Sequence, residues 1–154
     1  MPKQQGKKEI TTNRKAFHDY FVLERFEAGI SLAGTEVKSI RGGQVNLKDS
    51  FCTIKDGELY VRGMHVSPYE HGNIFNKDPV RPRKLLMHKR EIIKLNARVM
   101  QDGTALIPLS LYFHDGKVKV ELGLCKGKKL HDKRDSEAER ESRRDIERTL
   151  KEHL

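Results

Sequence analysis

Residues 117–134 read KVKVELGLCKGKKLHDKR, and the two halves of this stretch differ in character. In the first half, valine and leucine alternate with charged residues, which is the two-residue period of a half-buried β-strand. The second half is rich in lysine and contains one apolar residue, Leu130. Because a strand with one apolar face must pack onto a core, we predict that a folded body ends near Cys125 and that a charged tail follows it.

Two β-hairpins are predicted upstream of this boundary. Asp56-Gly57 and Asp115-Gly116 each separate two strand-like runs, and aspartate followed by glycine is a strong signal for a two-residue hairpin turn. Residues 22–30 alternate as a further strand, in which Val22 lies on the apolar face and Glu27 on the polar face.

Two helices are predicted between the strands. Thr35 is suited to cap a short helix over residues 36–41, which Gly42-Gly43 ends. Residues 89–101 keep helical spacing, and Asp102-Gly103 supplies the stop signal.

Together these elements predict a mainly β fold, an OB-type antiparallel β-barrel of about six strands with two or three short helices. An irregular α+β sandwich stays open as an alternative. We predict a flexible basic arm at residues 1–12, the OB-type barrel at 13–130, and a C-terminal tail at 131–154 that is disordered when free.

The charge balance indicates a polyanion as a partner. The 154 residues carry 31 Lys and Arg against 22 Asp and Glu, a net charge of +9. Residues 1–125 hold 21 basic and 14 acidic side chains, whereas residues 126–154 hold 10 and 8, so most of the excess lies on the body. A basic domain is typical of proteins that bind nucleic acid, although many basic proteins carry only solvated lysines.

The sequence offers no signal for a membrane, a metal or a cofactor. No window approaches the length of apolar sequence that a membrane span needs, and without a signal peptide the distant Cys52 and Cys125 are expected to stay reduced in the cytoplasm. Zinc sites need closely spaced cysteine and histidine pairs, which are absent. His18-Asp19 resembles a base and its orienting partner, but adjacent side chains of an extended chain point apart and no nucleophile is implicated, so an enzyme is not expected.

A long proline-containing connection over residues 65–86 carries the densest positive patch of the body. From Lys77 to Lys94 there are seven Lys and Arg against two acidic residues. Long loops inside compact domains are often functional, and the prolines stiffen Arg81, Arg83 and Lys84. A solvated surface is the alternative, but we favour binding to RNA phosphates.

The tail has a latent helical pattern. Ala138, Ile146, Leu150 and Leu154 share a spacing of four, and no glycine or proline interrupts them. The apolar stripe is too narrow to hold a helix on a core. We therefore expect the tail to be unfolded or nascent helix alone and to become helical on a partner, the alternative being a solubilising tail.

Taken together, the motifs resemble the SsrA-binding protein family, SmpB, the partner of tmRNA in bacterial trans-translation. The resemblance runs from about Asn13 to Arg134. The matching stretches are NRKAFHDYF, FEAGI with GTEVKSIR, NLKDSF, DPVRPRKLLMHKREI, PLSLYF and KGKKLHDKR. Each is weak alone, but six in the family's order are a strong signal.

The resemblance implies a non-enzymatic adaptor. The body would bind the tRNA-like domain of tmRNA and deliver it to stalled ribosomes for rescue and tagging of incomplete proteins. The tail would occupy the empty mRNA channel and the decoding centre, where small-subunit rRNA is the main partner. The protein is expected to act as a cytoplasmic monomer without a cofactor.

Candidate site residues follow from the matching motifs and from the exposed basic positions. Glu27 and Leu85 fall in motifs tied to tmRNA binding, and His18 is placed by the resemblance near the RNA and the ribosomal A site. Because Glu27 is negatively charged, it would accept hydrogen bonds from RNA hydroxyl or amino groups. The remaining RNA-binding candidates are Lys38, Arg41, Arg81, Arg83, Lys84, Lys119, Lys126, Lys128 and Lys129.

The resemblance also assigns the start of the tail. His131 matches the position that stacks at the decoding centre, and Asp132, Lys133 and Arg134 begin the segment in the channel. Ile146 and Leu150 are included on their spacing alone. Two rivals stay open: a general single-strand or ribosomal RNA binder with the tail as a tether, and an RNA-processing enzyme that uses His18.

Overall fold

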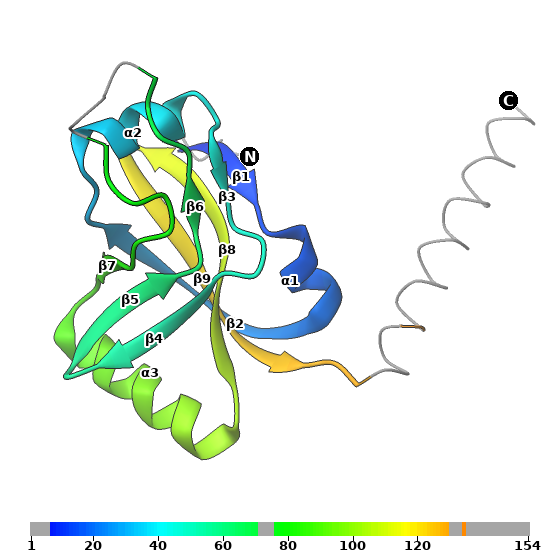
Figure 1. The fold of residues 1–154 in the computed structure, drawn as a ribbon. Helices are drawn as coiled ribbons and strands as arrows, with labels where there is room; N and C mark the ends of the chain where they lie inside the picture. Colours follow the sequence, from blue (N-terminus) through cyan, green and yellow to red (C-terminus); the bar gives the residue numbers. More distant parts are fainter. Residues whose placement is uncertain (1–6, 71–75, 130–133, 135–154) are drawn as a thin grey trace, which may run out of the picture.

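Nine strands and three helices make up the described part of the computed structural model, which covers residues 7–70, 76–129 and 134 (Figure 1). The strands are β1 (Lys7–Thr12), β2 (Tyr20–Ile30), β3 (Val45–Asn46), β4 (Phe51–Lys55), β5 (Glu58–Arg62), β6 (His65–Val66), β7 (Arg83–Leu86), β8 (Ala105–His114) and β9 (Lys117–Gly127). The helices are α1 (Arg14–Asp19), α2 (Gly34–Arg41) and α3 (Lys89–Asp102).

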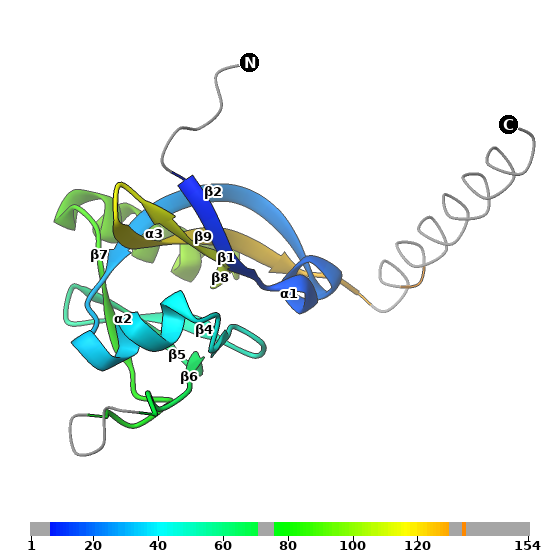
Figure 2. The ribbon, with the colours of Figure 1, turned by 90° about the horizontal axis from the view of Figure 1, so that it is seen from above.

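The main sheet closes on itself. Its seven strands follow the order β1-β8-β4-β5-β7-β2-β9, and β9 also pairs with β8, so that all strands except β1 form a closed antiparallel ring. The predicted mainly β fold with a ring of about six strands is thereby confirmed. In Figure 1, α2 and α3 lie at opposite ends of this ring, and Figure 2 shows α1 beside it.

Both predicted hairpins are present. Asp56 and Gly57 join β4 to β5, and Asp115 and Gly116 join β8 to β9, with positive φ at all four residues. The alternation that predicted β9 is also confirmed, because its valines and leucines are buried. The predicted boundary at Cys125 was slightly too early, since Lys126 and Gly127 still pair with β2.

Two apolar clusters hold the body together. The larger fills the ring and includes Leu59, Leu111 and Leu124, and the smaller lies under α1 and joins Ala16 to Leu109. β8 contributes to both clusters, so it is buried on both of its faces. Cys52 and Cys125 are free thiols, and burial raises the pKa of the Cys125 thiol to about 11.

The predicted flexible arm was wrong for residues 7–12, while residues 1–6 lie outside the described part. Residues 7–12 form β1, which pairs with the far half of β8 from Lys7 opposite His114 to Thr12 opposite Ser110. Its one apolar side chain, Ile10, packs partly buried against the ring core, and backbone hydrogen bonds to β8 also hold the strand in place. Local composition could not reveal this partner, because β8 lies about a hundred residues further along the chain.

The region around α1 also differs from the prediction. The Asn13 side chain accepts a hydrogen bond from the Ala16 backbone N–H and begins a helix that was not predicted. A bulge in β2 between Val22 and Glu24 then changes which way the side chains face. Val22 therefore packs under α1, whereas the even spacing had placed it inside the ring.

The connection over residues 65–86, which was predicted as one long loop, contains two strands. β6 and β7 lie at its two ends, and residues 71–75 lie outside the described part. Near it, α2 begins at Gly34, one residue before the predicted cap, Thr35. The Glu36 carboxylate caps this helix instead, by accepting from the Ala33 backbone N–H at 2.8 Å.

A buried ion pair joins α2 to β7. Arg83 is 1% exposed and donates from Nε to Glu36, which is 4% exposed, at 2.6 Å. The remaining nitrogens of the same guanidinium donate to the carbonyl groups of Met64 and Pro79. Both charges are thereby paired and hydrogen-bonded, as burial requires.

Among the described residues, none of the helices combines the length and the apolar character that crossing a membrane requires. The α3 helix, the longest of them, ends as predicted at Gly103, whose φ of 62° is left-handed.

Replacing Glu36 with glutamine should lower the free energy of unfolding by about 3 kcal/mol, because Arg83 would keep a buried charge without its counter-ion. Urea unfolding followed by circular dichroism measures this. Glu58→Gln is the matched control, since it removes an exposed ion pair with Lys84 and should cost less than about 1 kcal/mol. Equal losses in the two variants would contradict the stabilising role assigned to Glu36.

The ion pair of Glu36 with Arg83 should also make the stability of the protein depend on pH. Burial alone would raise the pKa of Glu36, but hydrogen bonds from Arg81, the Ala33 N–H and Arg83 outweigh it and hold the pKa below its ordinary 4.5. The stabilisation is therefore complete above pH 4.5 and is lost as the pH falls through the lower value of the folded state. The stability difference between wild type and Glu36→Gln should shrink in this acidic range.

Replacing Gly123 with alanine should destabilise the body by about 1–3 kcal/mol through overpacking. A Cβ atom there would lie 2.8 Å from Leu109 Cδ1 and 2.9 Å from Cys125 Sγ. Gly127→Ala on the same strand is the control, because its Cβ would meet no described atom within 4 Å. Urea midpoints that fall equally in both variants would refute the packing explanation.

Candidate RNA interface

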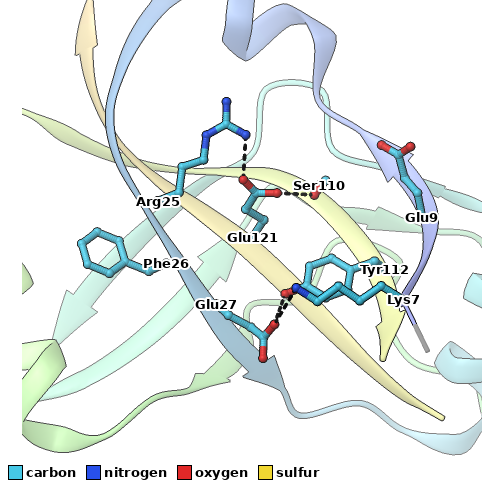
Figure 3. Close-up of a pocket in the computed structure, with 8 residues that line it drawn as sticks. All are labelled: Lys7, Glu9, Arg25, Phe26, Glu27, Ser110, Tyr112 and Glu121. Carbon is cyan, nitrogen blue, oxygen red and sulfur yellow. Dashed lines mark hydrogen bonds and ion pairs between the residues drawn. The ribbon is translucent and has the colours of Figure 1, made fainter. Parts of the chain in front are cut away.

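A polar pocket lies on the outer wall of the ring where β1, β2, β8 and β9 run side by side (Figure 3). The strand register sets Glu27 opposite Glu121 and Glu9 opposite Tyr112, so alternate residues of these strands share the outer face. The pocket is lined by Lys7, Glu9, Arg25, Phe26, Glu27, Ser110, Tyr112 and Glu121.

Both carboxylate oxygens of Glu121 already have partners within the pocket. Arg25 Nη1 lies 2.8 Å from Oε1, and the Ser110 hydroxyl donates to Oε2 at 3.2 Å. This carboxylate therefore belongs to the framework of the pocket.

Glu27 is held through one oxygen only. The Tyr112 hydroxyl donates to Glu27 Oε2, and Lys7 Nζ and His114 Nδ1 lie 3.8 Å and 4.0 Å from the same atom. Within the described residues, no hydrogen bond or ion pair reaches Oε1, and Figure 3 shows this oxygen turned away from Tyr112 and Lys7. Burial and the nearby Glu27 charge raise the pKa of Tyr112, so its hydroxyl stays a neutral donor.

A second group of candidates gathers where the described body ends. Lys128 Nζ lies 5.1 Å from the centre of the Phe21 ring and 3.2 Å from the Phe17 carbonyl oxygen, and the Lys128 backbone N–H donates to the Asp19 carbonyl. Phe21 is 44% exposed, so an aromatic ring and cations share this surface. Lys126 and Lys129 are exposed beside it.

The other basic candidates on the body are exposed or half-buried and have partners of their own. Lys38 and Arg41 lie over the rings of Tyr69 and Phe113, at 5.3 Å and 5.9 Å from the ring centres. Lys84 pairs with Glu58 at 2.9 Å, and this hydrogen bond raises the pKa of Lys84.

Two further basic candidates, Arg81 and Lys119, lie away from these aromatic rings. Arg81 is half-buried and joins the Glu36 ion pair described above. Lys119 lines a hollow that it shares with Glu27 and Gly29.

Two predicted RNA contacts were wrong. Arg83 is buried in the ion pair with Glu36, and Leu85 is 1% exposed inside the ring, so neither side chain can reach a ligand. The sequence pattern failed because β7 alternates inward at both positions while Lys84, between them, faces out.

His18 and Asp19 also differ from the prediction. They lie at the end of α1 and not on an extended chain, and His18 Nδ1 is 2.9 Å from Asp19 Oδ1.

The assignments in the tail lie almost wholly outside the described residues. This applies to His131, Asp132, Lys133, Ile146 and Leu150. Arg134 is described and is exposed.

Sequence reasoning missed several residues of the pocket. Glu121 was not predicted as a site residue either. The strand register brings Tyr112 and Lys7 to the predicted Glu27, and Arg25 to Glu121, because β1, β2, β8 and β9 pair side by side. Phe21 was missed for the same reason, because it meets the lysines at the end of β9 only through its pairing with Lys126.

Comparison with known proteins identifies the family. A family model described as "SmpB protein" matches residues 10–152. An SsrA-binding protein of Acetivibrio thermocellus is 58% identical over 151 residues, which covers 98% of both chains. One of Clostridium tetani is 60% identical over 151 residues and covers 98% of this chain and 97% of its own.

A solved structure described as "tmRNA-SmpB: a journey to the center of the bacterial ribosome" also matches. Its chain is 51% identical, with a TM-score of 0.66, and the match covers 78% of this chain and 85% of that one. The match with the family model spans most of the sequence and includes the pocket residues Glu27, Tyr112 and Glu121. On this evidence, the chain belongs to the SmpB protein family.

Proposed function

We propose that this protein binds the tRNA-like domain of tmRNA and delivers it to stalled ribosomes for trans-translation. The observation that carries the proposal is the identity of 57–60% with SsrA-binding proteins over nearly the whole chain. The protein acts as an adaptor in the cytoplasm, where bacterial ribosomes work, and uses no catalytic group of its own.

The body is the part that binds tmRNA. Its outer wall offers Glu27 and Lys119, and the end of the body offers Phe21 with Lys126, Lys128 and Lys129. Cations bind phosphates and release counter-ions, while aromatic rings stack on unpaired bases. Lys38, Arg41 and Lys84 add positive charge elsewhere on the surface.

The tail, residues 131–154, is the part that binds the ribosome. The spacing of its apolar residues supports a helix that forms on a partner. It would occupy the mRNA channel, with His131 at the decoding centre and Asp132, Lys133 and Arg134 after it, and with Ile146 and Leu150 on its apolar stripe. His18 lies on the same side of the body as Lys128, whose backbone bonds to Asp19.

Removal of residues 131–154 should separate the two activities. We expect affinity for tmRNA to remain nearly intact, because the pocket and the described lysines lie on the body, and tagging on stalled ribosomes to be abolished. Filter binding measures the first quantity and a reconstituted tagging reaction the second. A parallel loss of affinity and tagging would contradict the division of labour between body and tail.

Neutralising Lys126 and Lys129 together should weaken tmRNA binding and flatten its salt dependence by up to about two counter-ion equivalents. Both side chains are exposed at the end of the body. The matched control replaces Lys48 and Lys55, which are also exposed and lie outside the candidate surface. If the slope of log affinity against log salt changes equally in both double variants, overall charge and not this surface is responsible.

A general RNA binder remains the rival function, in which the tail is only a tether. It predicts similar affinity for many RNAs, whereas an adaptor for tmRNA should bind that RNA preferentially. Sequencing the RNA that co-purifies with the protein from its own cells distinguishes the two.

A further inference from the structure

The chain leaves the body beside the end of α1 (Figure 2). β9 ends at Gly127, which lies opposite Tyr20, the first residue of β2. One residue later, the Lys128 backbone N–H donates to the Asp19 carbonyl oxygen at 2.8 Å, so the pairing of β9 continues onto the last residue of the helix. Lys128 therefore joins the end of the sheet to α1.

The last carbonyl groups of α1 need donors from outside the helix, because a helix leaves its final four carbonyls without partners of its own. The Tyr20 backbone N–H donates to the carbonyl of Ala16. Lys128 serves two more, since its Nζ lies 3.2 Å from the Phe17 carbonyl oxygen and its backbone N–H donates to Asp19. Lysine is suited to this role at a helix end. Lys128 thus caps α1 from 111 residues further along the chain than Phe17.

A ring contact adds to these hydrogen bonds. Lys128 Nζ lies 5.1 Å from the centre of the Phe21 ring, which is within the range of a cation–π attraction. Lys128 is half-buried, whereas Lys126 and Lys129 are exposed on either side of it. The ammonium of Lys128 is therefore held by the body, and this distinguishes it from its neighbours.

We propose that Lys128 is a positioning residue, which fixes the point and the direction at which the tail leaves the body. The inference rests on the proposed function, in which body and tail bind at different places, and adds how the two are held relative to each other. Backbone that is ordered before binding loses no further conformational entropy when the tail binds. Without the attachment, the chain after Gly127 would be free to turn away from the binding site of the tail.

Four variants of the full chain test the proposal. Lys128→Met removes the ammonium but keeps the backbone N–H, and Lys128→Arg restores a cation that can donate and can lie over a ring. Phe21→Leu removes the ring contact and leaves both hydrogen bonds in place, so it decides the question if Lys128→Met does not fold. Lys117→Met is the matched control, because this exposed lysine lies at the opposite end of β9.

Nuclear magnetic resonance relaxation measures whether the attachment orders the chain. In wild type and in Lys128→Arg, the amide order parameters of residues 128 and 129 should be near 0.85, the value of rigid backbone. In Lys128→Met they should fall below about 0.6, the range of flexible backbone, and in Phe21→Leu they should take intermediate values. Lys117→Met should match wild type.

Tagging on stalled ribosomes measures whether this order matters for function. The reaction is run with the protein and tmRNA at saturating concentrations, so that a loss of tmRNA affinity does not contribute. Lys128→Met should lower tagging about tenfold, the change expected when a hydrogen bond from a charged donor is lost. Lys128→Arg should restore most of the activity, and Lys117→Met should tag like wild type.

Each contrary result overturns a defined part of the account. If Lys128→Met tags poorly while the amides stay as ordered as in wild type, Lys128 acts through contact with RNA and its positioning role is wrong. If the amides lose order but tagging is normal, the attachment has no part in delivery. If Lys128→Met does not fold, unchanged order and tagging in Phe21→Leu would overturn the proposal. Failure of wild type to bind tmRNA or to tag would instead overturn the proposed function, whatever order the free protein shows.

Discussion

The pairing of β8 with three other strands is the constraint on which the structure depends. β9 lies along one edge of β8, while β1 and β4 share the other edge at different heights. Because the strand pairing of β4 with β8 is limited to one position, Cys52 opposite Leu106, the ring closes at a narrow seam. Burial of β8 between the ring core and the α1 cluster compensates for the few hydrogen bonds at that seam.

Local signals in the sequence were sufficient to predict the turns, strands and helices that a short window of residues encodes. The two Asp-Gly turns, the alternation of β9 and the period of α3 are each encoded in a short window, and each is found in the structure. The wrong predictions concern segments whose conformation depends on a strand or helix far away in the sequence. β1 has a single apolar residue, Ile10, and pairs with an edge of β8 that the local sequence does not reveal. The β2 bulge redirects Val22 toward α1.

In the candidate site, too, the sequence revealed some residues and the fold was needed to reveal the others. The exposed lysines and Glu27 were identified from the motifs, but motif membership could not distinguish Lys84, which faces out, from Arg83 and Leu85, which face in. The neighbours of Glu27 come from strands far apart in the chain, so only the register of the sheet reveals them. The buried pair of Arg83 with Glu36 also explains why a run of basic residues need not be a binding surface.

The attachment of Lys128 to α1 limits how far the residues that follow it can extend from the body. Its backbone and side chain are both bonded to α1, so the 25 residues after Lys129 start from a point fixed on the body. A chain of that length extends at most about 90 Å, so its far end is confined to a limited volume around this point. Once the body is seated on an RNA, a receptor inside that volume would meet the tail at an effective concentration of up to about millimolar. A weak affinity of the tail for its receptor would then be enough.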